Sequence, residues 1–434
     1  MNILAKNFLV YGTGLSGTSA VSFLLSRGAK NVYIYDDNKK VEISDTTTLE
    51  NLDNIAALNL ECVILSPGVQ ILGNENIQKF IDNNIDFISE FALGFEYVQG
   101  KKICVTGTNG KTTTVNLIYE MCKQKFKNVF LCGNTKIPIT KIANLTSKDS
   151  IVICEVSSFA LETAKDVKPY VSSILNITKD HLNRHQTFEN YTKIKSKITK
   201  VQDKDDYFVC LDSFDIKTDA TIVNYSLNDK SSGAYLQNNF ICYKNKKILN
   251  KDQINLIGEK NLENILCAVT ISKLLKVKNR QIKKVLKEFK GLKHRLQKVM
   301  VKDNITYIDD SKATNPDSTI FALNSFNNKI ILLLGGSDKG YSYDDVFQYC
   351  FNVKKILTFG QMAEKIKMAA LQNNFEQVVS FDKMKEAVEY ATKIAENGDV
   401  VLFSPACASF DEFNSYDERG NEFIKIIKGI NEKN

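Results

Sequence analysis

Apolar and polar residues alternate along the chain in blocks that predict strands followed by helices. The run NFLVYG at 7–12 predicts a short apolar strand that ends in a glycine-rich turn, and an amphipathic helix is predicted over 19–26. The runs NVYIYDD at 31–37 and CVILSPG at 62–68 are further strands that end in turns. Alternating strand and helix units of this kind favour a parallel sheet.

A second block of the same kind begins after Gln99. The strand KICVTG leads into a helix predicted over 111–123. Three more apolar runs that end in polar groups follow, at 128–132, 150–155 and 171–177. Between 203 and 256 short alternating runs with Asn and Gly turns predict a small layer of hairpins, and a helical stretch then leads to Gly291.

A third block starts near Leu292 and repeats the strand–helix rhythm in ITYIDD, KIILLLGG, KILTFG and VVLFSPA. Three such blocks predict an α/β protein of three domains. We expect an N-terminal Rossmann-like domain at 1–99, a central P-loop-type mononucleotide-binding domain at 100–291, and a C-terminal Rossmann-like domain at 292–434. In open α/β sheets ligands gather outside the carboxyl ends of the strands, and a site between domains is the default expectation.

Composition narrows the class of protein. With 43% apolar and 25% charged residues in 434, the chain is typical of a soluble globular protein, and its net charge of +7 is spread along the whole length. That spread argues against a nucleic-acid partner, which needs a basic stripe or block. No apolar run reaches the ~20 residues that span a bilayer, and the N-terminus lacks a signal-peptide pattern. The ten cysteines lie mostly in apolar runs, which predicts buried thiols in a reducing cytoplasm.

The segment GTGLSG, with Gly12, Gly14 and Gly17, fits the pattern G-x-G-x-x-G between a strand and a helix, and Asp36 follows 19 residues after Gly17. Glycines there let the backbone approach a phosphate, while the helix N-terminus supplies N–H donors. The pattern indicates a dinucleotide fingerprint. A tight turn that needs glycine only for packing is the alternative, and the motif does not say which phosphorylated ligand it binds.

The segment ICVTGTNGKTTT at 103–114 has the surroundings of a phosphate-binding loop but not the usual spacing. The standard form G-x-x-x-x-G-K-[ST] would place its first glycine at Val105. Lys111 is nevertheless placed to reach phosphates, Thr112 to ligate Mg²⁺, and the loop N–H groups to hold phosphate oxygens. A chance Gly-Lys-Thr in a loop is the alternative.

Polar side chains follow the next strands of the second block. Glu155 ends one apolar strand, where a carboxylate holds Mg²⁺ in many nucleotide enzymes. Asp180 and His181 follow another strand, at the same predicted sheet edge as the loop of Lys111. That convergence favours His181 as a metal ligand, although a lone histidine is more often structural. The serines after Glu155 also suit a helix cap.

Three polar loops follow strands of the third block: DDSKATNPDS, LGGSDKG and SPACASFDEF. Each contains a residue suited to reading negative charge, namely Lys312, Lys339 and Ser409. Two lysines and hydroxyls around one sheet end suit an acidic substrate. Any one of these loops alone fits an ordinary solvated loop equally well.

Together these motifs resemble the Mur ligase family, over nearly the whole chain from Gly12 to Phe423. TGTNGKTTT is similar to that family's shortened phosphate loop, G-[ST]-N-G-K-[ST]. In this shorter form no glycine is expected at the position of Val105. DDSKATN and SPACASFDEF with RGNEF are most particular to the members that add D-glutamate. The resemblance implies that ATP phosphorylates the carboxylate of UDP-N-acetylmuramoyl-L-alanine, and that the amine of D-glutamate attacks the acyl phosphate, in peptidoglycan synthesis.

The resemblance also implies roles for individual residues. Those expected to bind ATP are Gly107, Thr108, Asn109, Gly110, Lys111, Thr112, Thr113, Asn261, Asn264, Arg295 and Asp310. Those expected to hold Mg²⁺, at two sites, are Thr112, Glu155, His181 and Lys195. The UDP substrate is expected at Leu15, Ser16, Asp36, Asp37, Asn134 and Ser157, and D-glutamate at Lys312, Thr314, Lys339, Ser409 and Tyr416. Lys111, His181 and Lys195 are the residues expected to be catalytic.

Lys195 is expected to carry a carbamate, because it lies four residues after Tyr191 in YTKIKSK and so fits the family's Y-x-x-x-K pattern. A slip to Lys193 or Lys197 stays open, as does a solvated helix face. The chain departs from the family at three places: CGNTKIP has Cys132 and Lys136 in place of glycines, Lys260 replaces a histidine, and Tyr416 replaces a phenylalanine.

Two other functions compete with the ligase. A nicotinamide-dependent oxidoreductase would use GTGLSG and Asp36, but it leaves the second phosphate loop and the three loops of the third block unexplained. A non-catalytic nucleotide-binding regulator would be expected to have lost Lys111, Glu155 or His181, and all three are present. For the ligase we expect a cytoplasmic monomer that neither binds nucleic acid nor inserts into a membrane.

Overall fold

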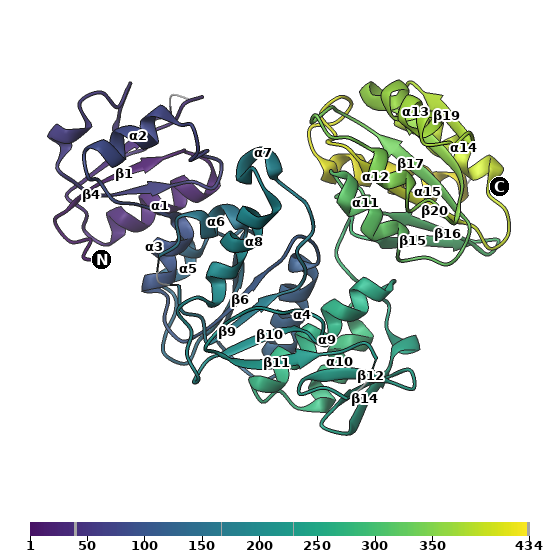
Figure 1. Cartoon of the computed structure of the whole chain (residues 1–434), viewed down its shortest axis with the longest axis horizontal. Helices are drawn as coiled ribbons and strands as arrows, with labels where there is room; N and C mark the ends of the chain where they lie inside the picture. The colour runs from purple at the N-terminus through teal and green to yellow at the C-terminus, as the bar shows by residue number, and fades with distance from the viewer. Residues whose placement is uncertain (39–40, 166, 229, 432–434) are drawn as a thin grey trace. The chain divides into compact units, whose positions relative to one another are not determined.

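The computed structural model describes residues 1–38, 41–165, 167–228 and 230–431, in which strands and helices alternate as predicted (Figure 1). By its internal contacts the chain forms two compact units. One consists of Met1–Lys251 with Glu263–Val285, and the other of Asp252–Leu262 with Leu286–Asn434. The domain boundaries near 99 and 291 stay predictions.

The first unit begins with a five-stranded parallel sheet in the order β3-β2-β1-β4-β5. Its elements are β1 Asn7–Tyr11, α1 Leu15–Ser26, β2 Asn31–Tyr35, β3 Thr47–Thr48, η1 Ile55–Leu58, β4 Leu60–Leu65, α2 Glu75–Asp82, β5 Phe87–Ser89 and α3 Glu90–Tyr97. Alternate residues of β1 serve the two faces: Phe8 and Val10 pack with α1, while Leu9 and Tyr11 pack with α2. The predicted helix over 19–26 in fact begins at Leu15.

The second sheet of this unit has six parallel strands in the order β11-β10-β9-β6-β8-β7. They are β6 Lys101–Thr106, β7 Val129–Gly133, β8 Ile151–Glu155, β9 Val171–Ile174, β10 Tyr207–Leu211 and β11 Thr221–Tyr225. The intervening helices are α4 Lys111–Lys123, α5 Ile139–Ala143, α6 Ser158–Glu162, α7 Leu182–His185, α8 Phe188–Ser196 and η2 Lys197–Thr199. Because β6 lies between β8 and β9, the loop after it has a strand end on either side.

The prediction of hairpins throughout 203–256 is wrong for β10 and β11, which join the parallel sheet. Phe208, Val209 and Cys210 are buried, and such a continuous apolar run is typical of a parallel strand covered on both faces. An antiparallel layer does form from β12 Ala234–Gln237, β13 Phe240–Tyr243 and β14 Lys246–Asn250. It is followed by η3 Lys251–Gln253, α9 Glu259–Leu274 and α10 Asn279–Glu288.

The second unit contains a six-stranded sheet in the order β15-β16-β20-β17-β18-β19, in which only β15 is antiparallel to its neighbour. Its strands are β15 Gln297–Lys302, β16 Ile305–Asp309, β17 Ile330–Gly335, β18 Val353–Phe359, β19 Val378–Phe381 and β20 Val400–Ala406. The helices are α11 Pro316–Leu323, α12 Asp344–Phe347, η4 Gly360–Met362, α13 Ala363–Gln372, α14 Met384–Ile394 and α15 Tyr416–Asn431.

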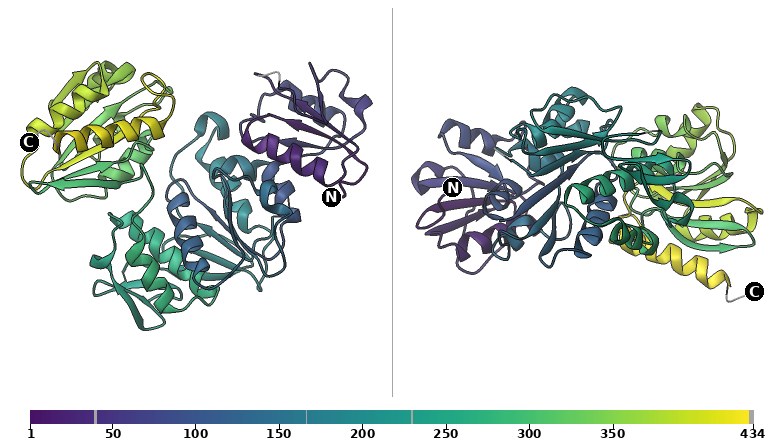
Figure 2. Two further views of the ribbon diagram at one scale, coloured as in Figure 1. Left: turned by 180° about the vertical axis from the view of Figure 1, so that it is seen from behind. Right: turned by 90° about the horizontal axis from the view of Figure 1, so that it is seen from below.

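Helices cover both faces of this sheet. Leu323 of α11 and Ile366 of α13 belong to one core, while Ala387 of α14 and Phe423 of α15 belong to the other. Figure 2 shows α15 running along the sheet. The α/β class with several parallel sheets is therefore confirmed, and the ends of β16, β20 and β17 fall side by side.

Two predictions from composition can also be examined. All ten cysteines are free and buried, which confirms the prediction of buried thiols. Among the described helices none is both long and apolar enough to cross a membrane.

Candidate functional site

The loop between β6 and α4 is held open by bonds to the segment after β9. The N–H of Thr108 donates to the carbonyl of Asn176 at 2.9 Å, and the N–H of Asn109 donates to the Asn176 side-chain oxygen at 2.9 Å. Gly107 and Gly110 have φ of +146° and +86°, where a side chain is strained. The structure thus gives this loop a defined cradle at the N-terminus of a thirteen-residue helix.

Lys111 lies across the loop that precedes it. Its Nζ donates to the carbonyls of Gly107 and Thr108, at 2.7 Å each. On the other side, a Cβ placed on Gly110 would come within 2.2 Å of the side-chain oxygen of Asn264. The structure therefore brings Asn264 of α9 against the loop, a contact that the sequence did not predict.

Glu155 ends β8 beside this loop and is 3% exposed. Its Oε1 accepts a hydrogen bond from the Asn134 amide at 3.0 Å. Its Oε2 is buried without a hydrogen-bond partner among the described residues. A buried carboxylate oxygen with no partner is costly unless a cation or a donor meets it, so Glu155 fits the chemistry of a divalent-cation ligand.

His181 stands at the N-terminal end of α7 with φ of +54°, in the left-handed region. Its ring lies edge-on to Phe159 with 4.8 Å between the centroids. Burial is the main cause that lowers the pKa of His181; the charges of Lys111 and Lys195 lower it further, while Asp180 opposes them. The ring is thereby kept neutral, which is the form that ligates a metal.

Lys195 on α8 is the buried member of the three lysines in YTKIKSK, at 1% exposure. Its Nζ donates to the carbonyl of Gly107 at 2.9 Å and lies 4.7 Å from the centre of the Tyr191 ring. Lys193 is exposed, and Lys197 donates to the Glu162 carbonyl instead. Burial, and after it the charge of Lys111, hold the pKa of Lys195 well below its usual range. A neutral amine is the form that reacts with carbon dioxide.

The remaining predicted residues of this part lie nearby. Thr112 and Thr113 form the first turn of α4, half-buried and buried respectively. Asn261 is one turn before Asn264 on α9, and its amide donates to the carbonyl of Ile257 at 2.8 Å. No group of three or more His, Cys, Asp or Glu side chains in the described residues is arranged to hold a metal by protein ligands alone. Any cation here would need further ligands, as Mg²⁺ takes from water and phosphate.

A cavity of about 420 Å³ lies at the carboxyl end of β1 and is lined by most of the residues predicted for the UDP substrate. Asp36 accepts from the N–H and hydroxyl of Thr13 at 2.6 and 2.8 Å, which fixes the glycine turn. Tyr11 donates to Asp37 at 2.7 Å; burial, and then that bond, raise the pKa of Tyr11 to about 12. Predicted residues in the lining are Leu15, Ser16, Asp36, Asp37 and Asn134.

Gly17 permits a close approach within this turn, since a Cβ there would fall 1.8 Å from the carbonyl oxygen of Gly12. Ser157, also predicted for the UDP substrate, does not line the cavity. Its hydroxyl accepts from the N–H of Ala160 at 3.1 Å and caps α6, as the alternative interpretation of this serine proposed.

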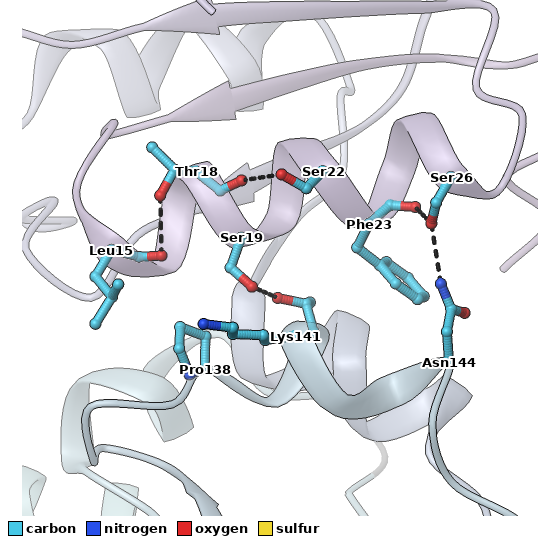
Figure 3. A pocket seen from close by; sticks show the side chains of 10 residues that line it. Leu15, Thr18, Ser19, Ser22, Phe23, Ser26, Pro138, Lys141 and Asn144 are labelled. Carbon is cyan, nitrogen blue, oxygen red and sulfur yellow. Dashed lines mark hydrogen bonds between the residues drawn. The ribbon is translucent and has the colours of Figure 1, made fainter.

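A second cavity of about 420 Å³ lies between α1 and α5, where hydroxyls line its wall (Figure 3). Thr18 and Ser22 donate back to carbonyls of their own helix. Ser19 bonds to Thr140 at 2.7 Å, and Thr140 donates its N–H and hydroxyl to Glu90 at 2.8 and 2.7 Å. These bonds tie α1, α5 and α3 together.

In the second unit, Lys312 and Tyr416 meet. The Nζ of Lys312 donates to the hydroxyl of Tyr416 at 2.7 Å and lies 4.2 Å from its ring centre. Burial raises the pKa values of both Asp310 and Tyr416, and the charge of the half-buried Arg295 opposes both shifts. Two cations beside a hydroxyl suit a small acidic ligand.

Asp310 is buried and accepts from the N–H of Leu296 at 3.1 Å and from the hydroxyl of Ser404 at 2.8 Å. Burial raises its pKa to about 7. Its neighbour Asp309 is bonded to His294 at 2.6 Å, both fully buried. These partners hold the start of the loop that carries Lys312.

Arg419 contacts the loops after β16 and β20 and the end of β17. Its buried guanidinium donates to the carbonyls of Ser311 at 2.8 Å, Cys407 at 3.0 Å and Ala408 at 3.0 Å, with a longer contact to Gly335. The three loops that the sequence singled out are thus joined by one side chain. Of the other predicted D-glutamate residues, Ser409 is buried, Thr314 is half-buried and Lys339 is exposed.

Sequence reasoning missed several residues that shape these sites. Asn176 holds the phosphate loop, and Arg419 joins the C-terminal loops. Tyr11 and the turn Ser66–Val69 line the first cavity. The turn carries a usable signal, since a Ser-Pro-Gly after an apolar strand ends at the same sheet edge as the glycine turn. Arg419 opens the segment RGNEF that the family resemblance singled out, but no role was predicted for it, and Asn176 bonds to groups far away in the chain, which leaves no local pattern.

Comparison with known proteins relates the whole chain to one family. Residues 105–272 match the family model for the Mur ligase middle domain, and residues 294–407 match that for the Mur ligase, glutamate ligase domain. The UDP-N-acetylmuramoylalanine--D-glutamate ligase of Caldanaerobacter subterraneus subsp. tengcongensis is 36% identical, over 99% of this chain and 100% of the relative. The ligase of the same name from Lachnoclostridium phytofermentans is also 36% identical, over 100% of each chain.

Solved structures agree on the fold. The crystal structure of MurF ligase from Thermotoga maritima in complex with ADP is similar with a TM-score of 0.62, over 100% of this chain and 99% of that one. Sequence identity in that pair is 16%, so the likeness concerns the fold alone.

Proposed function

The chain belongs to the Mur ligase family, and from that premise we propose that it is an ATP-dependent ligase that adds D-glutamate to UDP-N-acetylmuramoyl-L-alanine. The observation that carries the proposal is full-length identity of 36% to ligases of that name. The phosphate loop with Lys111 across it and the unsatisfied Glu155 oxygen beside it support the same chemistry. A cytoplasmic monomer working in peptidoglycan synthesis is part of the proposal.

The reaction balances as two displacements. A carboxylate oxygen of the muramoyl substrate attacks the γ-phosphorus of ATP, and ADP leaves. The D-glutamate nitrogen then attacks the acyl carbon, loses a proton, and inorganic phosphate leaves as the amide forms. The first step brings two anions together, so its barrier depends on nearby positive charge and on alignment.

Residues of the phosphate loop would supply that charge and alignment. Lys111 and the loop N–H groups that follow Asn109 would bind the phosphates, while the N–H groups of Thr108 and Asn109, donated to Asn176, and the contact of Asn264 with Gly110 would fix the loop. Glu155 and His181 would hold Mg²⁺, together with Thr112, and the cation would neutralise charge on the transferred phosphoryl group. The buried neutral amine of Lys195 would add carbon dioxide and release a proton, so that the carbamate oxygens extend beyond the nitrogen, which keeps an N–H to donate to Gly107.

The two other groups of residues would bind the reactants. The cavity lined by Leu15, Ser16, Asp36, Asp37 and Asn134 would hold the UDP substrate. Lys312, Thr314, Lys339, Ser409 and Tyr416 would bind D-glutamate, while Arg295 and Asp310 would contact ATP. Lys312 and Lys339 would supply the positive charge that a dicarboxylate requires.

The experiment that tests the proposal is release of phosphate from ATP and Mg²⁺ with UDP-N-acetylmuramoyl-L-alanine and D-glutamate. We expect release that requires both substrates, and a product heavier by one glutamate residue in mass spectrometry. Omission of D-glutamate is the matched control. Absence of release would overturn the proposal, and oxidation of a nicotinamide cofactor in its place would favour the oxidoreductase.

A further inference from the structure

Arg184 connects the helix that follows His181 with the wall of the substrate cavity. It lies on α7, three residues after His181, and its side chain is 11% exposed. Its Nη1 donates to the carbonyl of Pro67 at 2.8 Å, and its Nη2 donates to the carbonyl of Val69 at 2.8 Å. Pro67 and Val69 both line the cavity at the end of β1.

The guanidinium is itself fixed from the opposite side. Its Nε donates to both carboxylate oxygens of Glu162, at 3.1 and 3.0 Å, and its Nη2 donates to Oε2 at 2.5 Å. It lies 4.0 Å from the centre of the Phe159 ring. Glu162 is in turn 3.1 Å from the ring nitrogen of His185. A planar guanidinium with several fixed partners has one orientation. It therefore fixes the positions of the groups it bonds to, in addition to supplying charge.

The turn 66–69, to which Arg184 donates, is hydrogen-bonded to the glycine turn that follows β1. The hydroxyl of Ser66 donates to the carbonyl of Gly12 at 2.6 Å, and the N–H of Ser66 donates to the carbonyl of Tyr11 at 2.9 Å. A displacement of the turn 66–69 would therefore change the cavity wall and the glycine turn together. Because Arg184 joins α7 to this turn, it fixes the position of the cavity wall relative to His181, which lies just before α7.

We propose that Arg184 is a positioning residue that holds the turn 66–69 in register with His181, and so determines the affinity for the UDP substrate. The inference rests on the proposed function, in which the cavity binds that substrate. Lysine cannot replace arginine here, because an ammonium lacks the planar fork that meets two carbonyls and a carboxylate at once.

The test compares Arg184→Lys and Arg184→Met with Lys165→Met in the full-length protein. Lys165 also joins these parts of the unit, through an ion pair with Asp86 at 2.8 Å in which both side chains are exposed. For each variant, KM is measured for the UDP substrate, ATP and D-glutamate, Kd for the UDP substrate by calorimetry, and Tm by scanning calorimetry.

For both Arg184 variants we expect KM and Kd for the UDP substrate to rise roughly 10- to 100-fold, as for loss of charge-assisted bonds. KM for ATP should stay within about threefold, and Lys165→Met should match the wild type. Equal rises in all three KM values, or no rise for the UDP substrate in a folded variant, would overturn the inference. If the wild type itself fails to bind the UDP substrate, the proposed function fails instead.

Discussion

The Nζ of Lys195 donates to the carbonyl oxygen of Gly107, so a lysine from α8 supports the turn that begins the phosphate loop. The same amine is 1% exposed and has a strongly lowered pKa. A buried neutral amine beside a backbone carbonyl is reactive toward carbon dioxide, whereas an exposed ammonium is not. This relationship separates Lys195 from the two lysines beside it.

For Lys195→Ala we expect turnover to fall about 10²- to 10³-fold, the usual cost of removing one group that stabilises charge in the transition state. Short carboxylates such as acetate should restore part of the activity by occupying the space of the carbamate. Lys193→Ala, on the same helix but exposed, is the matched control and should retain normal turnover. Loss of activity in the control with a normal Lys195 variant would contradict the assignment.

For Lys111→Ala we expect kcat to fall by a similar factor of about 10²–10³ while the protein stays folded. The amine donates to the carbonyls of Gly107 and Thr108 in its own loop, and the residue is half-buried at the start of α4, outside the apolar core. Phosphate release and Tm are the measurements. Near-normal kcat would refute the assigned role, and a large drop in Tm would show that the lysine is structural.

For Gly110→Ala we expect KM for ATP to rise about 10- to 100-fold. The new Cβ would lie 2.2 Å from the Asn264 oxygen on a backbone with φ of +86°, and such strain typically costs about 1–3 kcal/mol. Gly429→Ala on α15 is a suitable comparison, because a Cβ there meets nothing within 4 Å. If both variants bind ATP equally well, the contact with Asn264 does not shape the loop.

Glu90→Gln should change how stability depends on pH. Burial raises the pKa of Glu90 from 4.5 to about 7, although Thr140 donors oppose the shift. The folded protein therefore holds a proton that the unfolded chain releases, so this stability is complete below pH 4.5 and is lost as pH rises through 7. Across that window the wild type should lose about 3 kcal/mol relative to the variant. Urea unfolding from pH 4.5 to 8 measures it; parallel curves would contradict it.

Much of the fold could be predicted because its strands are short apolar runs with glycine or polar residues at their ends. The helix over Lys111–Lys123 has the bounds predicted, since a left-handed glycine starts it and its apolar face is periodic. The segment 207–225 was misassigned because short strands with Asn turns look alike in parallel and antiparallel sheets. The continuous apolar run Phe208–Cys210 was the sequence signal for a parallel strand, and these residues are buried in the structure.

The site was less predictable than the fold. Strand-end positions correctly indicated that Glu155 and the loop of Lys111 lie at one sheet edge. The approach of Asn264 to Gly110, the bonds of Asn176 and the grip of Arg184 depend on packing between segments far apart in the chain. No local spacing encodes such contacts. The family resemblance named Asn264 only as a residue expected to bind ATP, so all three contacts come from the structure.

The burial of Arg419 has a consequence for how the second unit assembles. Its guanidinium is fully enclosed, and its donors meet the carbonyls of Ser311 after β16 and of Cys407 and Ala408 after β20, with a 3.5 Å contact to Gly335 at the end of β17. A charge in that position without those acceptors would cost several kcal/mol. An intermediate with one loop detached is therefore disfavoured, and the three loops should exchange amide hydrogens as a single cooperative group. The loops that carry Lys312, Lys339 and Ser409 would then take their final positions together, in the same event that folds the sheet.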